Sequence, residues 1–97
     1  MESRIELSGF GDIDSSSMEI VQKNVLNHFR KIESITKNMQ KLHVTMKKVH
    51  SKEKSEKYEV HVKLVDDGGV YISKVTERNL LSVVEKALEK IMNEISR

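Results

Sequence analysis

The first third of the chain shows two successive hydrophobic periods. Residues 3–10 (SRIELSGF) place apolar side chains at alternate positions, which is typical of a half-buried β-strand. Further on, apolar residues recur at spacings of three and four, as they do along one face of an α-helix. This stripe consists of Met18, Val21, Val25, Phe29 and Ile32. Ser16 is followed three residues later by Glu19, a capping-box pattern, so we expect the helix to start near Ser17 and to fade around residues 37–39.

The remaining chain alternates again and then returns to a helical period. Residues 42–49 and 58–65 each predict a strand, with the lysine-rich residues 50–57 forming their connection. Asp-Asp-Gly-Gly at 66–69 is a tight-turn signal, which predicts a third antiparallel strand over 70–75. Thr76 is the expected cap of a second helix. Its apolar stripe is Leu80, Val84, Leu88, Ile91 and Ile95.

The element order β-α-β-β-β-α predicts an α+β fold, a two-layer sandwich of the dsRBD-like kind. A right-handed crossover through the first helix would make the first two strands parallel neighbours, and hairpins would add the other two antiparallel. The result is a four-stranded mixed sheet with two helices on one face and the other face open to water. The length of 97 residues suits one domain over residues 1–97.

The charge is distributed unevenly along the chain. The net charge is only +2, but residues 20–63 hold eleven lysines and arginines against four glutamates. A block this basic gives the molecule a positive side that attracts polyanions. The absence of cysteine excludes disulfides and thiol chemistry. No apolar run approaches the roughly 20 residues that span a bilayer, and the first residues lack a signal-peptide pattern, so we expect a cytoplasmic protein without membrane contact.

Enzyme and metal chemistry find little support in the residues. His43 and His61 are candidate cross-strand neighbours, but no third ligand is evident, so we expect no metal site. No phosphate loop and no Ser/His/Asp arrangement is apparent, which argues against an enzyme or a cofactor. Phe10 and Tyr71 remain as possible base-stacking groups. The open sheet face is otherwise expected to show His and Lys, which suits the backbone or shape of structured RNA better than single strands.

Three stretches resemble a known family. They are "LNHFRKIESI" at 26–35, "KYEVHVKLVDDGGVYISKV" at 57–75 and "RNLLSVVEKALEKIMNEI" at 78–95. Together with the element order they resemble the ribosome hibernation factors, the RaiA/HPF family also called sigma-54 modulation proteins. Asn79 stands where that family usually has Asp, and Leu81 where it usually has an aromatic residue.

The resemblance implies a non-enzymatic protein that occupies the mRNA and tRNA cleft of the ribosomal small subunit and holds ribosomes inactive under stress. It implies ribosomal RNA as the partner, with no DNA specificity. The implied RNA-binding residues, with Lys63 added from the sheet pattern, are Lys23, Arg30, Lys31, Lys47, Lys48, Lys63, Lys86 and Lys90.

Two alternatives stay open on the same fold. One is a protein-interaction or self-association module that uses the open sheet face or an edge strand, with the charge serving solubility. The other is a binder of a different structured RNA. Lys52, Lys54 and Lys57 are mixed with Glu53 and Glu56, so we expect them to form a mobile, solvated connection that takes a smaller part in binding.

Overall fold

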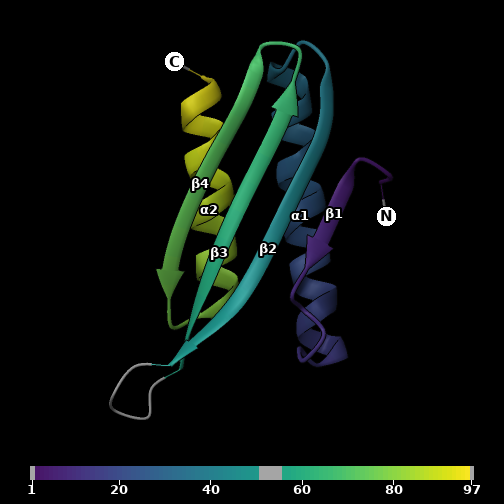
Figure 1. Cartoon of the computed structure of the whole chain (residues 1–97). Helices are drawn as coiled ribbons and strands as arrows, with labels where there is room; N and C mark the ends of the chain where they lie inside the picture. The colour runs from purple at the N-terminus through teal and green to yellow at the C-terminus, as the bar shows by residue number, and fades with distance from the viewer. Residues whose placement is uncertain (1, 51–55, 97) are drawn as a thin grey trace.

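The predicted element order is confirmed by a computed structural model, which describes residues 2–50 and 56–96 (Figure 1). Its elements are β1 (Ile5–Ser8), α1 (Ser15–Ile35), β2 (Met39–His50), β3 (Glu56–Asp66), β4 (Gly69–Glu77) and α2 (Leu80–Ile95). Within these residues neither helix is long and apolar enough to cross a membrane.

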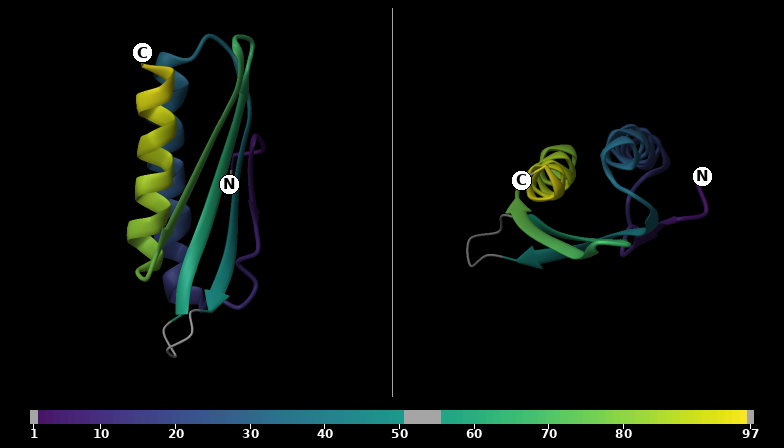
Figure 2. Two further views of the ribbon diagram at one scale, coloured as in Figure 1. Left: turned by 60° about the vertical axis from the view of Figure 1, so that its left-hand side comes forward. Right: turned by 90° about the horizontal axis from the view of Figure 1, so that it is seen from above.

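The strands form one mixed sheet in the spatial order β1-β2-β3-β4. β1 runs parallel to β2, with Ile5 opposite Leu42, and the other two pairings are antiparallel. Both helices lie on the same face of the sheet and leave the other face open, as Figure 2 shows in its end-on view. The predicted α+β sandwich is therefore confirmed, including the crossover through α1.

The core lies between the helices and one face of the sheet. Alternate residues of the central strands point toward the helices, and Leu42, Val62 and Leu64 are completely buried there. They pack in one cluster with buried side chains of both helices, among them Phe29 and Leu88. Full burial of a Leu, Val or Phe side chain contributes roughly 1.5–3 kcal/mol, so this single layer of contacts fixes which sheet face stays exposed.

Each helix begins at a different cap from the predicted one. Asp14 is the N-cap of α1, and its Oδ2 accepts a hydrogen bond from the Ser17 N–H at 3.1 Å, so the helix starts two residues before the predicted position. Asn79 caps α2 and accepts from the Ser82 N–H at 2.9 Å. Thr76, the predicted cap, instead lies within β4. A short oxygen-bearing side chain directly before the first helical turn satisfies the free N–H groups best.

The two hairpins differ from one another in how well the sequence predicted them. The turn at 66–69 is confirmed: Asp66 pairs with Gly69, and the Asp66 carboxylate accepts from the Gly68 N–H at 2.7 Å. β2 and β3 are longer than predicted, because β2 runs from Met39 to His50 and β3 from Glu56 to Asp66, so that Lys57 belongs to a strand rather than to the connection. The predictions for residues 51–55, including those for Lys52 and Lys54, lie outside the described residues.

The β1 side of the sheet is held by Arg4. Its guanidinium pairs with Glu33 of α1 at 2.5 Å, donates to the Met39 carbonyl at 3.3 Å and lies 5.0 Å from the centre of the Phe29 ring. Glu2 pairs with the same group at 3.1 Å. The flanking carboxylates raise the pKa of Arg4, chiefly because they accept hydrogen bonds from its guanidinium, Glu2 having the larger effect and Glu33 the next. Arg4 is thus committed to joining β1 with α1.

Candidate nucleic-acid interface

On the open face of the sheet, polar side chains of neighbouring strands lie opposite one another. On this face Lys63 lies opposite His43, and Lys47 lies opposite Glu59. Both lysines are exposed, as the sequence predicted. The lysines that share the open face, by strand alternation, are Lys41, Lys47, Lys57, Lys63 and Lys74.

Two glutamates interrupt this face, and each is matched by a lysine. Lys41 Nζ lies 3.0 Å from a carboxylate oxygen of Glu6, and Lys74 Nζ lies 3.0 Å from one of Glu59. The hydrogen bond from Lys41 holds the pKa of Glu6 below its usual range, and the bond from Lys74 does the same for Glu59. Both carboxylates therefore remain ionised near neutral pH and cancel one lysine each.

Three other lysines keep their full charge. Within residues 2–50 and 56–96, Lys47, Lys57 and Lys63 have no carboxylate within ion-pair distance. They lie on the two central strands, β2 and β3. The centre of the open face is therefore the part with uncompensated positive charge, which is what a phosphate backbone requires of a docking surface.

His43 stands in a polar cluster that the sequence did not reveal. Its Nε2 lies 2.9 Å from Ser8 Oγ, 3.3 Å from Thr45 Oγ1 and 3.4 Å from a Glu6 carboxylate oxygen. The same residue types form a catalytic triad elsewhere, but there the serine and the acid bind opposite ring nitrogens. Here all three partners approach the same nitrogen, so no carboxylate orients the ring from the nitrogen opposite the serine, as a triad requires. The cluster fixes the imidazole on the open face.

The expected pairing of the two histidines was wrong in register. His61 lies opposite Thr45, and His43 lies opposite Lys63, so the histidines are diagonal neighbours. The His61 ring instead approaches the carboxylate of Glu59 at 3.6 Å. In the part of the chain that the structure describes, no three His, Cys, Asp or Glu side chains are grouped as metal ligands.

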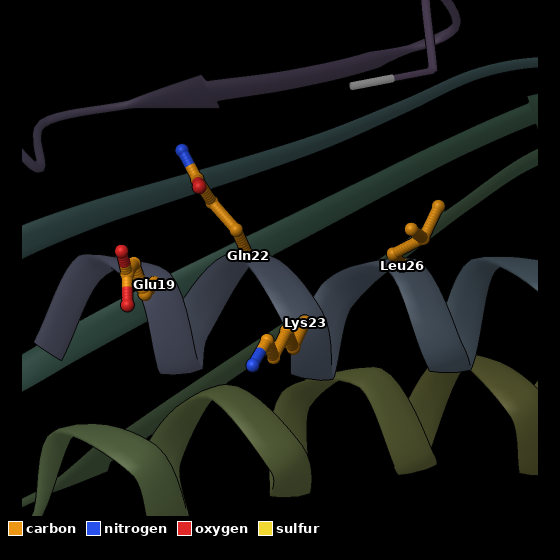
Figure 3. A pocket seen from close by; sticks show the side chains of 4 residues that line it. All are labelled: Glu19, Gln22, Lys23 and Leu26. Carbon is orange, nitrogen blue, oxygen red and sulfur yellow. The ribbon is translucent and has the colours of Figure 1, made fainter. Parts of the chain in front are cut away.

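The predicted residues of α1 lie in the other layer. Lys23, Arg30 and Lys31 are exposed on α1, and α1 itself lies in the helix layer, opposite the open sheet face (Figure 2). Lys23 lines a shallow hollow along α1 with Glu19, Gln22 and Leu26, and its side chain points toward α2 (Figure 3). α1 thus presents a second basic surface.

The remaining predicted residues lie near the rim of the sheet. Lys86 of α2 pairs with Glu77 of β4, so its charge is compensated within the fold. Lys90 Nζ lies 3.5 Å from the backbone carbonyl of Lys74 at the β4 edge. Lys48 is half-buried on the helix-facing side of β2, opposite Tyr58. The eight predicted residues therefore lie on more than one surface and do not form the one positive side that the sequence suggested.

Neither candidate stacking residue faces the solvent side of the sheet. Phe10 is buried in the core at 6% exposure. Tyr71 lies opposite the buried Leu64 on the helix-facing side and packs against the same core. Both predictions were wrong, because Phe10 packs into the core cluster and β4 turns its odd-numbered residues inward. The open face recognises no base by stacking on these rings.

Two solved structures superimpose on nearly the whole chain. A ribosomal subunit interface protein from Coxiella burnetii superimposes with a TM-score of 0.68 at 15% sequence identity, over 95% of this chain and 92% of that one. The N-terminal domain of Protein Y from Thermus thermophilus gives a TM-score of 0.62 at 12% identity, over 100% of this chain and 98% of that one. The chain has the fold of these two proteins. No protein-family model matches the sequence, and no curated protein matches it.

Proposed function

We propose that this protein binds the ribosome without catalysing a reaction, occupies the small-subunit cleft used by mRNA and tRNA, and so inhibits translation. The proposal is carried by the likeness in fold, over nearly the whole length of both chains, to a protein described as a ribosomal subunit interface protein. The residue patterns that resemble the hibernation factors lie on β3, β4 and both helices of that same fold.

The shape and the charge together favour a cleft over a flat surface. The molecule measures 44 × 26 × 16 Å, so it is a thin slab with two broad faces. Lys47 and Lys63 lie on one broad face, and Lys23 and Arg30 lie on the other. A protein that binds one flat RNA surface needs positive charge on one side only. Charge on both sides fits a slot whose two walls carry phosphates.

Binding by this mechanism is electrostatic and reversible. Lysines that neutralise phosphates release condensed counterions, so affinity falls steeply as salt rises. The role needs no cofactor, because occupation alone excludes mRNA and tRNA. The contacts of His43 with Ser8, Thr45 and Glu6 order this part of the open face before docking, which reduces the conformational entropy lost on binding.

Co-sedimentation with purified ribosomal small subunits at low and high salt tests the proposal. Lys47→Glu with Lys63→Glu alters the open face, and Lys23→Glu with Arg30→Glu alters the outer face of α1. Each pair is expected to weaken binding at least about tenfold, which corresponds to about 1.4 kcal/mol. Arg78→Glu is a charge-reversal control at an exposed position between β4 and α2, outside both faces.

The outcomes separate function from residue assignment. Absence of co-sedimentation at every salt concentration would overturn ribosome binding. Retention of an unrelated RNA duplex with equal affinity would favour a binder of another structured RNA. If only one of the two face variants loses affinity, the protein docks on a single wall, and the two-walled slot is wrong.

A further inference from the structure

β4 forms an open edge of the sheet. It pairs with β3 alone and spans Gly69–Glu77. The opposite edge is different, because β1 has only four residues and is flanked by Arg4 and its ion pairs. A long edge strand with free backbone groups is a template for pairing with another strand.

The exposed apolar side chains are concentrated on this edge strand. Ile72 is 68% exposed and Val70 is 55% exposed, the highest values among the large apolar residues that the structure describes. Both project from the open face of β4, one on each side of the inward-facing Tyr71. The rest of the open face is polar near its centre, so the apolar pair marks the rim as a surface suited to burial.

The backbone of this edge is accessible. Lys90 Nζ approaches the Lys74 carbonyl at 3.5 Å from α2, which places that carbonyl on the outer side of the strand. In an antiparallel strand a residue directs its N–H and its C=O to the same side, and alternate residues share that side. Val70 and Ile72 therefore direct their N–H and C=O groups to the outer side, where they are available to a further strand, whereas the Lys74 carbonyl already accepts from Lys90.

A hollow beside the edge adds matched charges. It has a volume of about 430 Å³ and is lined from β4 and α2 by Ile72, Ser73, Lys74, Lys90, Asn93 and Glu94. Lys90 and Glu94 are one helical turn apart on the side of α2 that faces this hollow. A two-fold axis between them would set each lysine against the glutamate of an antiparallel copy of the same helix.

We propose that two copies of the chain pair through β4 in antiparallel fashion and form one continuous eight-stranded sheet. Ile72 lies opposite the second copy's Val70, and Lys90 lies opposite the second copy's Glu94. Both contacts occur twice, as two-fold symmetry requires. A register that sets Lys74 against the second copy's Lys74 is disfavoured, because like charges directly opposite destabilise a sheet. The chosen register buries the two most exposed apolar side chains against each other.

The dimer goes beyond the proposed ribosome binding and does not depend on it. It joins the two open faces edge to edge, so the lysines of both copies lie on one surface. The mass of the RNase-treated protein, measured by light scattering after size exclusion over a range of concentrations, tests it without ribosomes. We expect twice the 11.2 kDa mass of the chain at high concentration. A dimer with a Kd of about 1 mM has a free energy of association of about 4.1 kcal/mol. A monomer at all concentrations up to about millimolar would therefore overturn the proposal.

Substitutions test the register. Ile72→Lys is expected to raise the dimer dissociation constant at least about tenfold. Ile35→Lys is its matched control, since Ile35 is a 46% exposed isoleucine on α1, away from the edge. Lys90→Glu and Glu94→Lys should each weaken the dimer, and the double swap should restore it. Equal weakening by Ile35→Lys, or no recovery in the double swap, would overturn the proposed interface; circular dichroism checks that each variant is folded.

Discussion

At the scale of single residues, the helix caps show what the sequence can and cannot decide. The segment before α1 offers Asp12, Asp14 and three serines as possible caps, and the residues before α2 offer Thr76 and Asn79. Pattern alone cannot choose among them, because the choice depends on where the chain leaves the sheet. β4 continues through Glu77, so Thr76 is used as a strand residue and the cap falls to Asn79. Asn in place of Asp preserves the capping oxygen.

Asn79→Ala is predicted to destabilise the protein by about 1 kcal/mol, because the Ser82 N–H loses its acceptor at the start of α2. Urea unfolding followed by circular dichroism measures the change, and Asn79→Asp should retain the wild-type stability. Asn93→Ala is the control, since Asn93 is exposed within the same helix and alanine favours helix there. Equal losses for the two alanine variants would contradict the capping role.

The ion pairs of the open face predict a loss of stability in acid. The pKa of Glu59 is lowered in the folded state, chiefly by the hydrogen bond from Lys74, from its ordinary value of 4.5. The stabilisation is therefore complete above that value and is lost as pH falls through the lower folded-state pKa. Glu59→Gln should flatten part of this acid transition, with Glu89→Gln on the exposed side of α2 as the control. Thermal melts at several pH values measure the acid transition of each variant. An unchanged transition in Glu59→Gln would refute the link between Glu59 ionisation and stability.

At the scale of elements, hydrophobic periodicity predicted every strand and helix but placed several ends wrongly. Alternation in 42–49 and 58–65 identified β2 and β3, yet it missed that β2 extends from Met39 to His50 and β3 from Glu56 to Asp66. Charged residues can continue a strand when they lie on its exposed face. Where lysines and glutamates are mixed near a hairpin, the sequence does not indicate where the strands stop pairing. The faces of Phe10 and Tyr71 were missed for a related reason, since a single aromatic in a loop or at an edge has no periodic partner to orient it.

The end of β1 contains a glycine that the strand pairing requires. Gly9 has a φ of 83°, and a Cβ placed there would lie 2.0 Å from the backbone carbonyl oxygen of Met46 in β2. Gly9→Ala is predicted to cost about 2 kcal/mol or more, from the left-handed backbone and from displacement of the strand. Gly11→Ala is the matched control, because a Cβ there meets no atom within 4 Å. Chemical denaturation compares the two, and similar stabilities would show that the close approach is not maintained.

At the scale of the whole molecule, the location of the lysines could be predicted only residue by residue. The sequence correctly placed Lys47 and Lys63 on the open face and Lys23, Arg30 and Lys31 on the exposed side of α1. The predicted sandwich, with both helices on one face of the sheet, already implied that these two groups lie on opposite faces, although the basic block was interpreted as one positive side. The sequence could not show which lysines are already paired, since Lys86 meets Glu77 and Lys74 meets Glu59 across elements.

That difference in pairing predicts how the proposed affinity for ribosomal small subunits depends on salt. Each lysine that neutralises a phosphate contributes about 0.9 to the slope of log K against log salt. Lys47→Gln with Lys63→Gln removes two uncompensated charges, so the slope should become shallower by about 2. Lys86→Gln should leave it nearly unchanged, because Lys86 is engaged with Glu77. Co-sedimentation with small subunits from low to high salt gives the slope for each variant. If Lys86→Gln changed the slope as much per charge removed as the Lys47 and Lys63 variant does, the ion pair of Lys86 with Glu77 would have to open on binding. The helix side would then take an equal part in binding.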